Sequence, residues 1–173
     1  MEQKKNVVLI GFMGCGKTSV GIRLSYRLRR TFLDTDKHIE RKQGRSISDI
    51  FASDGESVFR QMETDCIKEL IETAGSVSQI YSTGGGTPVK EENRALLKEL
   101  GTVIYLKVSP EVVYERLKND TTRPLLQTEN PKARIEELLA ARKEAYESAA
   151  DVIIEVDNKG FEEIMEEIAA IVG

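Results

Sequence analysis

A short segment near the start of the chain, VVLIGFMGCGKTSVG at residues 7–21, restricts the possible folds most strongly. Residues 11–18 match the pattern G-x-x-x-x-G-K-[ST] at every fixed position. The uninterrupted apolar run at 7–10 is typical of a fully buried strand, and residues 16–29 have the pattern of a following helix. In this context the loop N–H groups and the helix N-terminus bind phosphate. The segment therefore predicts a phosphate-binding loop at the end of a buried strand.

Apolar runs of strand length recur along the chain and alternate with helical patterns. Strands separated by helices connect through right-handed crossovers and form a parallel sheet that is covered on both faces. A chain of 173 residues is long enough for one compact domain with a single core. We therefore expect one three-layer α/β domain over residues 1–173, with strands at 7–10, 31–34, 79–82, 102–108 and 152–156.

Helix starts are marked at three places. Ser109 and Asn130 are N-cap residues that each precede a proline, which favours the first helical position. The S-D-G-E stretch that begins at Ser53 has the form of a capping box, so we expect a helix to start there.

Two segments interrupt the alternation. Residues 37–75 form a long insertion between the second and third strands, with two or three helical pieces, and we expect it to bind the substrate. Residues 119–131 are polar, contain two prolines and lack periodicity. Since a long irregular loop in a compact domain is often a functional lid, we expect a lid at about 118–131.

Composition argues against several classes of partner. The net charge is −4, from 25 basic and 29 acidic residues, so no general cationic surface for nucleic acid is expected. The longest apolar runs fall far short of the ~18 residues of a membrane helix. Two cysteines, Cys15 and Cys66, make no disulfide framework, and a single histidine argues against structural zinc. We expect a cytoplasmic monomer that acts on small molecules, without a nucleic-acid or membrane partner.

The phosphate-binding loop suggests roles for its own residues. Lys17 would reach the outer phosphates of a nucleotide, and the Thr18 hydroxyl would bind Mg²⁺. Cys15 lies near a helix N-terminus, where a thiolate is favoured, so we expect an exposed thiol without a catalytic role. The loop residues expected to contact ATP are Gly11, Gly14, Cys15, Gly16, Lys17, Thr18 and Ser19.

Several classes of protein that contain such a loop lack support here. A GTPase would carry a guanine-specific N/T-K-x-D motif after a late strand, and none occurs. The D-N-K-G stretch at 157–160 follows the last strand, too late for a GTPase switch. A motor-type ATPase would end its third strand in an acid, whereas this strand runs into S-T-G-G-G. Kinases of small molecules and nucleotides remain.

Asp34 and Asp36 follow the second strand, at the edge where α/β sheets bind ligands. If the strand continues, their spacing of two points both carboxylates the same way. One would then support Mg²⁺ while the other takes a proton from an acceptor hydroxyl. The alternative is that Asp36 only caps the helix expected at 37–42.

Two arginines lie on helices with apolar faces. Arg60 flanks an apolar stripe, and Glu63 can orient it; the alternative is a solvated arginine in a weak ion pair. Arg142 lies among the apolar positions of the helix expected at 132–149. A buried guanidinium needs an anionic partner, which is either a structural acid or a carboxylate or phosphate of a ligand.

Two more arginines and a glycine run complete the candidates. Arg123, in the expected lid, could stabilise the charge of a transferring phosphoryl group, unless it is only a mobile loop residue. Arg116 precedes the lid on a helix and could flank the nucleotide. Gly84, Gly85 and Gly86 follow the third strand, so a ligand could approach their backbone closely; the alternative is a plain turn.

Together these residues resemble the shikimate kinase family. The resemblance runs in chain order over about residues 7–154, nearly the whole chain. The phosphate-binding loop alone occurs in many families, whereas D-x-D, F-R-x-x-E, G-G-G-T-P and R-P-L-L together are specific to this one. The segments that carry the resemblance are GFMGCGKTSVG, FLDTDKHIE, GRSISDIF, GESVFRQME, STGGGTP, RPLL and RKEAYESAADVII.

The resemblance implies a fold of the nucleoside monophosphate kinase type, with five parallel strands in the order 2-3-1-4-5. It implies ATP, Mg²⁺ and phosphorylation of the 3-hydroxyl of shikimate, on the pathway to chorismate and the aromatic amino acids. By position, Asp36 would meet the acceptor hydroxyl as orienter or base, and Asp34 would support Mg²⁺ beside Thr18. The catalytic residues it implies are Asp36, Lys17 and Arg123.

The same resemblance implies roles for the other candidates. Arg60 and Arg142 would hold the shikimate carboxylate, and the glycines at 84–86 would contact the ring hydroxyls. Arg123 would act on the phosphates, and Arg116 would lie beside the adenine. The rival interpretations are a gluconate or nucleoside monophosphate kinase, or a module that binds ATP without releasing ADP.

Overall fold

The sheet has five parallel strands in the order β2-β3-β1-β4-β5. The computed structural model describes residues 6–75, 78–123 and 126–173. The strands are β1 (Asn6–Ile10), β2 (Phe32–Asp34), β3 (Ile80–Ser82), β4 (Gly101–Lys107) and β5 (Val152–Glu155). The predicted fold class and strand order are therefore confirmed, and no strand end differs from its expected place by more than one residue, which is within the usual uncertainty of such boundaries.

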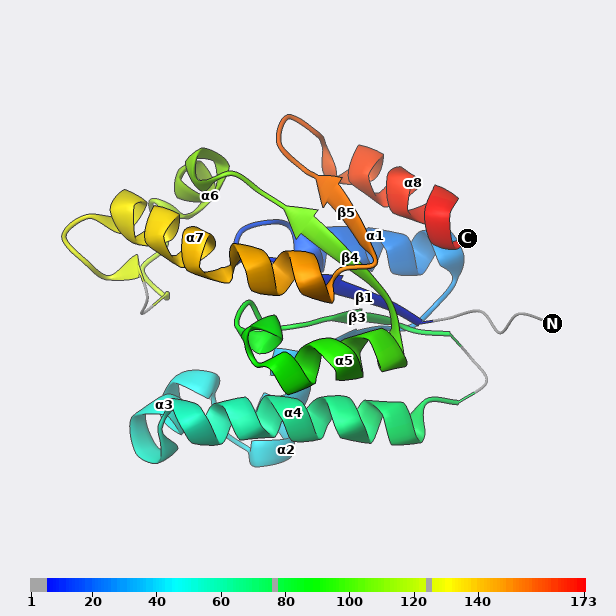
Figure 1. Ribbon diagram of the computed structural model, residues 1–173, viewed down its shortest axis with the longest axis horizontal. Coiled ribbons are helices and arrows are strands. Elements are labelled where there is room, and N and C mark those ends of the chain that lie inside the picture. The colour runs from blue at the N-terminus through cyan, green and yellow to red at the C-terminus, as the bar shows by residue number, and fades with distance from the viewer. Residues whose placement is uncertain (1–5, 76–77, 124–125) are drawn as a thin grey trace.

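Helices cover both faces of the sheet (Figure 1). On one face α1 (Lys17–Leu28) packs against α8 (Phe161–Val172). On the other face lie α5 (Glu91–Leu100) and α7 (Pro131–Ala149), and α4 (Glu56–Thr73) packs beside α5. The short helix α6 (Pro110–Leu117) packs against α7, and the 3₁₀ turn η1 (Thr87–Val89) lies against α4, α5 and α7.

The insertion at 37–75 folds into helices that pack on one another. Its elements are α2 (Thr35–Gln43), α3 (Ile47–Asp54) and α4, and both shorter helices contact α4. The expected capping box at Ser53 is wrong, because Ser53 lies in the last turn of α3 and its hydroxyl donates to Asp49 O at 2.7 Å. Gly55 separates the two helices with a φ of 90°, and α4 begins at Glu56 without a side-chain cap.

The other two predicted helix starts are confirmed. Ser109 Oγ accepts a hydrogen bond from Val112 N at 3.4 Å and caps α6. Asn130 Oδ1 accepts one from Ala133 N at 3.2 Å and caps α7. Local side-chain chemistry was sufficient at these two positions, because each cap bonds within its own first turn.

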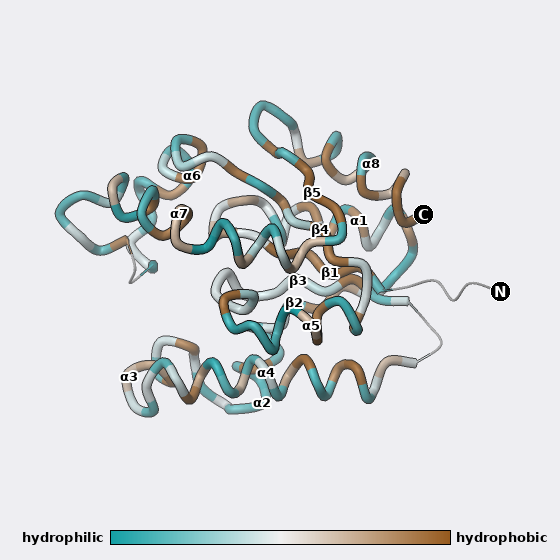
Figure 2. The backbone as a smooth tube through the Cα atoms, viewed as in Figure 1, coloured by the Kyte–Doolittle hydropathy of each residue, from teal (hydrophilic) through white to brown (hydrophobic). Residues whose placement is uncertain are grey.

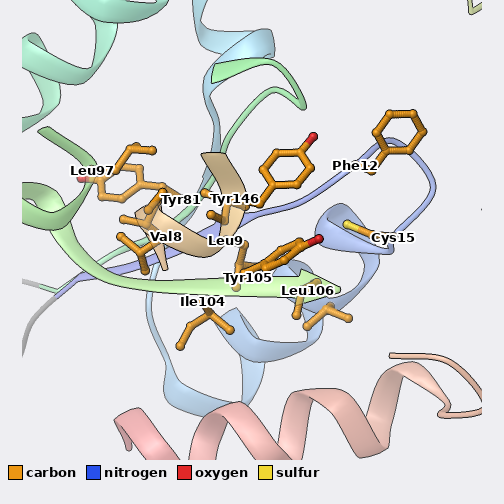
Figure 3. Packing of buried hydrophobic residues seen from close by; sticks show 14 of the residues in the cluster. Val8, Leu9, Phe12, Cys15, Tyr81, Leu97, Ile104, Tyr105, Leu106 and Tyr146 are labelled. Atoms are coloured by element: carbon orange, nitrogen blue, oxygen red, sulfur yellow. The ribbon is translucent and has the colours of Figure 1, made fainter. Parts of the chain in front are cut away.

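The core lies along the central strands, where the chain is most hydrophobic (Figure 2). The four apolar residues of β1 are fully buried, because β1 pairs with β3 on one side and β4 on the other. On β4, Ile104 and Leu106 point toward α8, while Tyr105 lies on the opposite face beside Tyr146 of α7 (Figure 3). The Tyr105 and Tyr146 ring centroids are 5.1 Å apart.

All five strands are parallel, so their carboxyl ends meet at one edge of the sheet. The phosphate-binding loop follows β1, Asp34 ends β2, and the glycine run 84–86 comes shortly after β3. Ligands of open α/β sheets bind at this edge. Within the described residues, no helix is long and apolar enough to cross a membrane.

Candidate active site

The loop between β1 and α1 is closed by its own lysine. Lys17 Nζ donates to Gly11 O at 2.6 Å and to Phe12 O at 3.2 Å. Gly16, the N-cap of α1, has a φ of 99°, a value that favours glycine. A Cβ at Gly16 would lie 2.8 Å from the Phe161 ring, so space also requires glycine there. The loop therefore holds an ammonium group at its centre beside the N-terminus of a helix, an arrangement suited to phosphate.

Cys15 is buried, so the expectation of an exposed thiol is wrong. Neither Cys15 nor Phe12 exposes any surface, and both belong to the core that Figure 3 shows at the end of β1. A Cβ at Gly11 would lie 2.8 Å from Cys15 Sγ, which shows how closely the thiol packs under the loop. The apolar packing of β1 thus continues into the loop. The expected contact of Cys15 with ATP stays a prediction.

Asp34 caps the helix that follows it. Its Oδ1 accepts hydrogen bonds from Asp36 N at 2.9 Å and Lys37 N at 3.3 Å. The strand ends at Asp34, so Asp36 lies in the first turn of α2 instead of continuing the strand. The alternative that Asp36 caps this helix is therefore wrong, because the helix begins two residues earlier than expected. This leaves the Asp36 carboxylate free for another role.

The Asp36 carboxylate lies in an unusual environment. Its Oδ1 is buried and has no hydrogen-bond partner in the described part of the chain. A Cβ at Gly84 would lie 2.8 Å from that oxygen. Burial, followed by the neighbouring carboxylates of Glu63 and Asp34, raises the pKa of Asp36 to about 7, against the opposing effect of two nearby cations. Asp36 can therefore take up or release a proton near neutral pH.

Arg60 is held between a carboxylate and a glycine. Its Nη1 donates to Glu63 Oε1 at 2.6 Å, and its Nη2 lies 3.4 Å from Glu56 Oε1. Only 2% of the Glu63 side chain is exposed, so this is not the weak surface pair of the alternative interpretation. A Cβ at Gly86 would lie 2.4 Å from Arg60 Nη2, so the guanidinium packs directly on the glycine backbone.

Arg142 has no acidic partner among the residues that the structure describes. Its Cζ lies 5.6 Å from the centre of the Phe12 ring, and its Nη1 would lie 3.4 Å from a Cβ at Gly85. One turn further along α7, the Tyr146 hydroxyl donates to Gly85 O at 2.5 Å. The sequence left two partners open for Arg142, a structural acid and an anionic ligand. Because the described residues contain no such acid, the structure favours an anionic ligand.

Arg116 lies on the other side of the phosphate-binding loop. Its Nη1 donates to Gly14 O at 2.7 Å, and its guanidinium lies 5.4 Å from the centre of the Phe161 ring. Arg23 lies 5.3 Å from the same ring. Phe161 was not a candidate, because nothing in the sequence at the start of α8 indicates that it would reach the loop. Arg116 is thus adjacent to the loop, as a residue flanking a nucleotide would be.

A cavity of about 620 Å³ brings many of the candidates together. Arg123 lines it with 45% of its side chain exposed, and its Nε lies 3.5 Å from Asp120 Oδ2. Pro124 and Leu125 of the R-P-L-L motif lie outside the described residues. The candidates that line the cavity are Gly14, Gly16, Lys17, Thr18, Ser19, Asp34, Asp36, Gly84, Gly85 and Arg123. Arg60 and Arg142 border the glycine run, and Arg116 stays outside the lining.

Two of the cavity residues fit a magnesium ion. Thr18 is exposed, and Asp34 uses only Oδ1 for its cap, so a hydroxyl and a carboxylate oxygen face the same cavity. Among the described residues, no group of three His, Cys, Asp or Glu side chains forms a metal site, in the cavity or outside it. Mg²⁺ usually binds one or two carboxylates together with substrate phosphates and water, so these donors suit it.

Comparison with known proteins tests the family. The shikimate kinase family model matches residues 13–172. The shikimate kinase of Thermodesulfovibrio yellowstonii is 46% identical over 164 residues, 95% of this chain and 92% of that protein. The chain belongs to the shikimate kinase family. The shikimate kinase of Thioalkalivibrio sulfidiphilus is 41% identical over 169 residues, 98% of this chain and 87% of that protein.

A solved structure of the family has the same fold. It is the shikimate kinase of Acinetobacter baumannii in complex with shikimate, with a TM-score of 0.91 and 38% identity over 99% of this chain and 94% of that chain. The family predicted from the motifs and the enzyme class, an ATP-using phosphotransferase, are confirmed. The gluconate and nucleoside monophosphate kinase alternatives are set aside by the same findings.

Proposed function

We propose that the cavity transfers the γ-phosphoryl group of ATP to the 3-hydroxyl of shikimate. The observation that carries this proposal is the glycine run 84–86, whose three residues face Asp36, Arg142 and Arg60 in that order. The guanidinium groups of Arg60 and Arg142 can bind the carboxylate of a ligand through paired N–H hydrogen bonds. The Asp36 carboxylate can accept a hydrogen bond from a hydroxyl on the ring of the same ligand. The arrangement therefore suits a small hydroxy acid that lies on the glycine backbone.

The reaction requires few covalent changes. The 3-hydroxyl oxygen forms a bond to the γ-phosphorus, the bond between that phosphorus and the bridging oxygen of ADP breaks, and the hydroxyl proton leaves. Asp36 orients this hydroxyl or accepts its proton. Its pKa of about 7 supports proton transfer near neutral pH. Positioning and charge stabilisation supply most of the acceleration in such transfers.

Cationic groups would stabilise the charge that develops on the phosphates. Lys17 now bonds to the carbonyl oxygens of Gly11 and Phe12, and it would exchange these for phosphate oxygens. Arg123 would give up a partly exposed pairing with Asp120, which costs little. Bound Mg²⁺, with Thr18 and Asp34 as protein ligands, would supply further charge neutralisation. We assign the insertion 37–75 to shikimate and the segment 118–131 to the lid.

An acceptor assay tests the reaction. We expect ADP release that depends on shikimate, and none above background with gluconate, AMP or CMP. Turnover with one of these other acceptors but none with shikimate would contradict the proposal, and ATP binding without turnover on any acceptor would indicate a non-catalytic module. The monomeric state and the cytoplasmic location stay predictions; sedimentation velocity tests the first.

Arg142→Ala tests the carboxylate clamp. Truncating one partner of a desolvated charge pair costs about 2 kcal/mol or more, so we expect the KM for shikimate to rise roughly 30-fold. The KM for ATP should stay within about twofold, because Arg142 meets the phosphate-binding loop at the buried ring of Phe12, which is not among the residues expected to contact ATP. Lys143→Ala, an exposed neighbour on α7, is the control and should leave both values unchanged. An unaltered shikimate KM in the Arg142 variant would refute the clamp.

A further inference from the structure

A group of buried polar side chains lies behind the glycine run, away from the cavity. Thr64 and Asn93 expose no surface, and Glu63 and Thr87 expose 2% each. Burying polar groups is costly unless they are hydrogen-bonded, so such a group persists when each member has a partner. The four residues come from α4, η1 and α5, three elements that only the tertiary fold brings together.

Their hydrogen bonds form one continuous series. Thr64 Oγ1 donates to Asn93 Oδ1 at 2.7 Å, and Asn93 Nδ2 donates to Thr87 O at 2.9 Å. The Thr87 hydroxyl donates to Glu63 Oε2, and Glu63 Oε1 accepts from Arg60 Nη1 at 2.6 Å. Asn93 thus uses both ends of its amide, one on α4 and one on the turn.

The series fixes the distance between the glycine run and α4. Thr87 directly follows Gly86, whose backbone packs against the Arg60 guanidinium. Thr87 N also donates to Gly84 O at 3.1 Å, which closes the turn. Arg60 is therefore confined by Glu63 on one side and by Gly86 on the other, and both of these are held by Thr87. A long arginine side chain would otherwise lose considerable rotamer freedom when it binds a ligand.

We propose that Thr87 and Asn93 are positioning residues for shikimate binding, acting on Arg60 through Glu63 and the glycine run. The side chains of Thr87 and Asn93 are almost completely buried and spend their hydrogen bonds on neighbouring protein groups, so we place them behind the substrate and not in contact with it. Their hydrogen bonds hold the guanidinium in the orientation that a carboxylate needs before the ligand arrives. This inference rests on the proposed role of Arg60 in binding the shikimate carboxylate.

A pair of substitutions at Thr87 tests the inference. Thr87→Val keeps the shape of the side chain and removes the hydroxyl that donates a hydrogen bond to Glu63. We expect the KM for shikimate to rise about tenfold, which corresponds to the loss of one hydrogen bond to a charged group. Thr87→Ser keeps the hydroxyl and should stay within about twofold of the parent enzyme. The KM for ATP should be unchanged in both. A purely structural role would lower thermal stability in Thr87→Val without separating the two KM values, and that result would overturn the inference.

Asn93→Asp supplies a second, independent test. The aspartate keeps the oxygen that accepts a hydrogen bond from the Thr64 hydroxyl. It replaces the amide group that donates to Thr87 O with a carboxylate oxygen, which repels that carbonyl oxygen. We again expect a rise of about tenfold in the KM for shikimate alone. An unchanged KM in a folded Asn93→Asp enzyme would count against the inference, whatever the result at Thr87.

A double-mutant cycle separates this inference from the assignment on which it rests. If Thr87 acts through Arg60, adding Thr87→Val to Arg60→Ala should change the KM for shikimate by less than twofold, although each single change raises it. Multiplicative effects would show that Thr87 acts by another route, and the inference would fail while the clamp stands. An Arg60→Ala enzyme with an unchanged KM for shikimate would instead refute the proposed role of Arg60 itself.

Discussion

Asp34 and Asp36 are two residues apart, yet their surroundings give them different tasks. Asp34 Oδ1 accepts two backbone N–H groups and starts α2, while Asp36 Oδ1 lies buried without a partner in the described structure. Their order in the chain predicted that both would lie at the sheet edge, and they do. Which one caps the helix depends on where the strand ends, and that is decided by the pairing of β2 with β3.

Asp36→Asn should stabilise the enzyme at alkaline pH when nucleotide and Mg²⁺ are absent. The pKa of Asp36 is about 7 in the folded protein against an ordinary value of 3.8, so stability falls as the pH rises from 3.8 through 7. At ~1.4 kcal/mol per pKa unit, ionised Asp36 costs a few kcal/mol at pH 8, and asparagine avoids this cost. Urea unfolding should show a large advantage of the variant at pH 8 and a smaller one at pH 5.

Asp54→Asn is the control for this experiment. Arg45 lowers the pKa of Asp54 below its ordinary value, so the stability that the pair contributes is lost only in acid, as the pH falls below about 3.8. The difference between this variant and the parent should therefore be the same at pH 8 and pH 5. An Asp36→Asn advantage that is equally independent of pH would contradict the raised pKa.

Asp34→Asn should weaken Mg²⁺ binding without weakening the fold. Asparagine caps helices about as well as aspartate, so the hydrogen bonds to Asp36 N and Lys37 N can persist. The lost negative charge should raise the Mg²⁺ concentration for half-maximal turnover about tenfold, an energy of ~1.4 kcal/mol. Steady-state rates across a Mg²⁺ titration measure this. Asp34→Ala removes the cap as well and should lower the melting temperature, which Asp34→Asn should not.

At the scale of elements, the glycines of strands and turns perform different functions. Gly86 in the turn after β3 lies against the guanidinium of the Arg60 side chain, whereas Gly101 begins β4 against the backbone of β1. A Cβ at Gly101 would lie 2.2 Å from Asn6 O. The sequence marks both positions only as glycine, so whether each lies against a side chain or against backbone is decided by the neighbouring elements.

Gly86→Ala and Gly101→Ala should therefore have opposite consequences. In Gly86→Ala the Arg60 guanidinium can shift away from the new methyl group, so we expect little change in stability. The shift would cost one hydrogen bond between Arg60 and the shikimate carboxylate, so the KM for shikimate should rise about tenfold. In Gly101→Ala the backbone cannot give way, so overpacking should cost about 1–3 kcal/mol and lower the melting temperature by several degrees. Its KM for shikimate should not change. Steady-state kinetics and thermal unfolding of both variants compare them directly; the reverse pattern would be incompatible with these contacts.

At the scale of the whole molecule, the sheet places its most buried strand at the centre. β1 pairs on both sides and its apolar residues are fully buried, whereas β5 pairs only with β4 and leaves 46% of Ile153 exposed. The central strand β1 leads into the phosphate-binding loop, while the charged residues proposed for shikimate come from α2, α4 and α7. The phosphate-binding loop thus follows directly on a strand whose apolar residues are fully buried.

Hydrogen exchange should reflect this arrangement. Amides of β1 open only when the whole domain unfolds, so they should exchange slowest, and amides of the edge strand β5 should exchange faster through local opening. Mass spectrometry or NMR of the ligand-free enzyme measures both rates. Equal protection of β1 and β5 would contradict this prediction.

The sequence by itself determined the strands, the phosphate-binding loop, the helix caps at Ser109 and Asn130, and the family. These features depend on residues close together in the chain, because a buried strand needs an apolar run and a cap bonds within its own turn. The family followed from motifs that occur in a fixed order, so it required no knowledge of how they meet in space.

Only the tertiary structure decided how the candidates are surrounded. Cys15 is buried, and among the described residues Asp36 Oδ1 has no hydrogen-bond partner and Arg142 has no acidic partner; each of these depends on what packs against the residue from elsewhere in the chain. The alignment of Asp36, Arg142 and Arg60 along three glycines joins α2, α7 and α4, which the sequence separates by many residues. Local chemistry specifies which groups are present, whereas long-range packing sets their solvation, their charge neighbours and therefore their function.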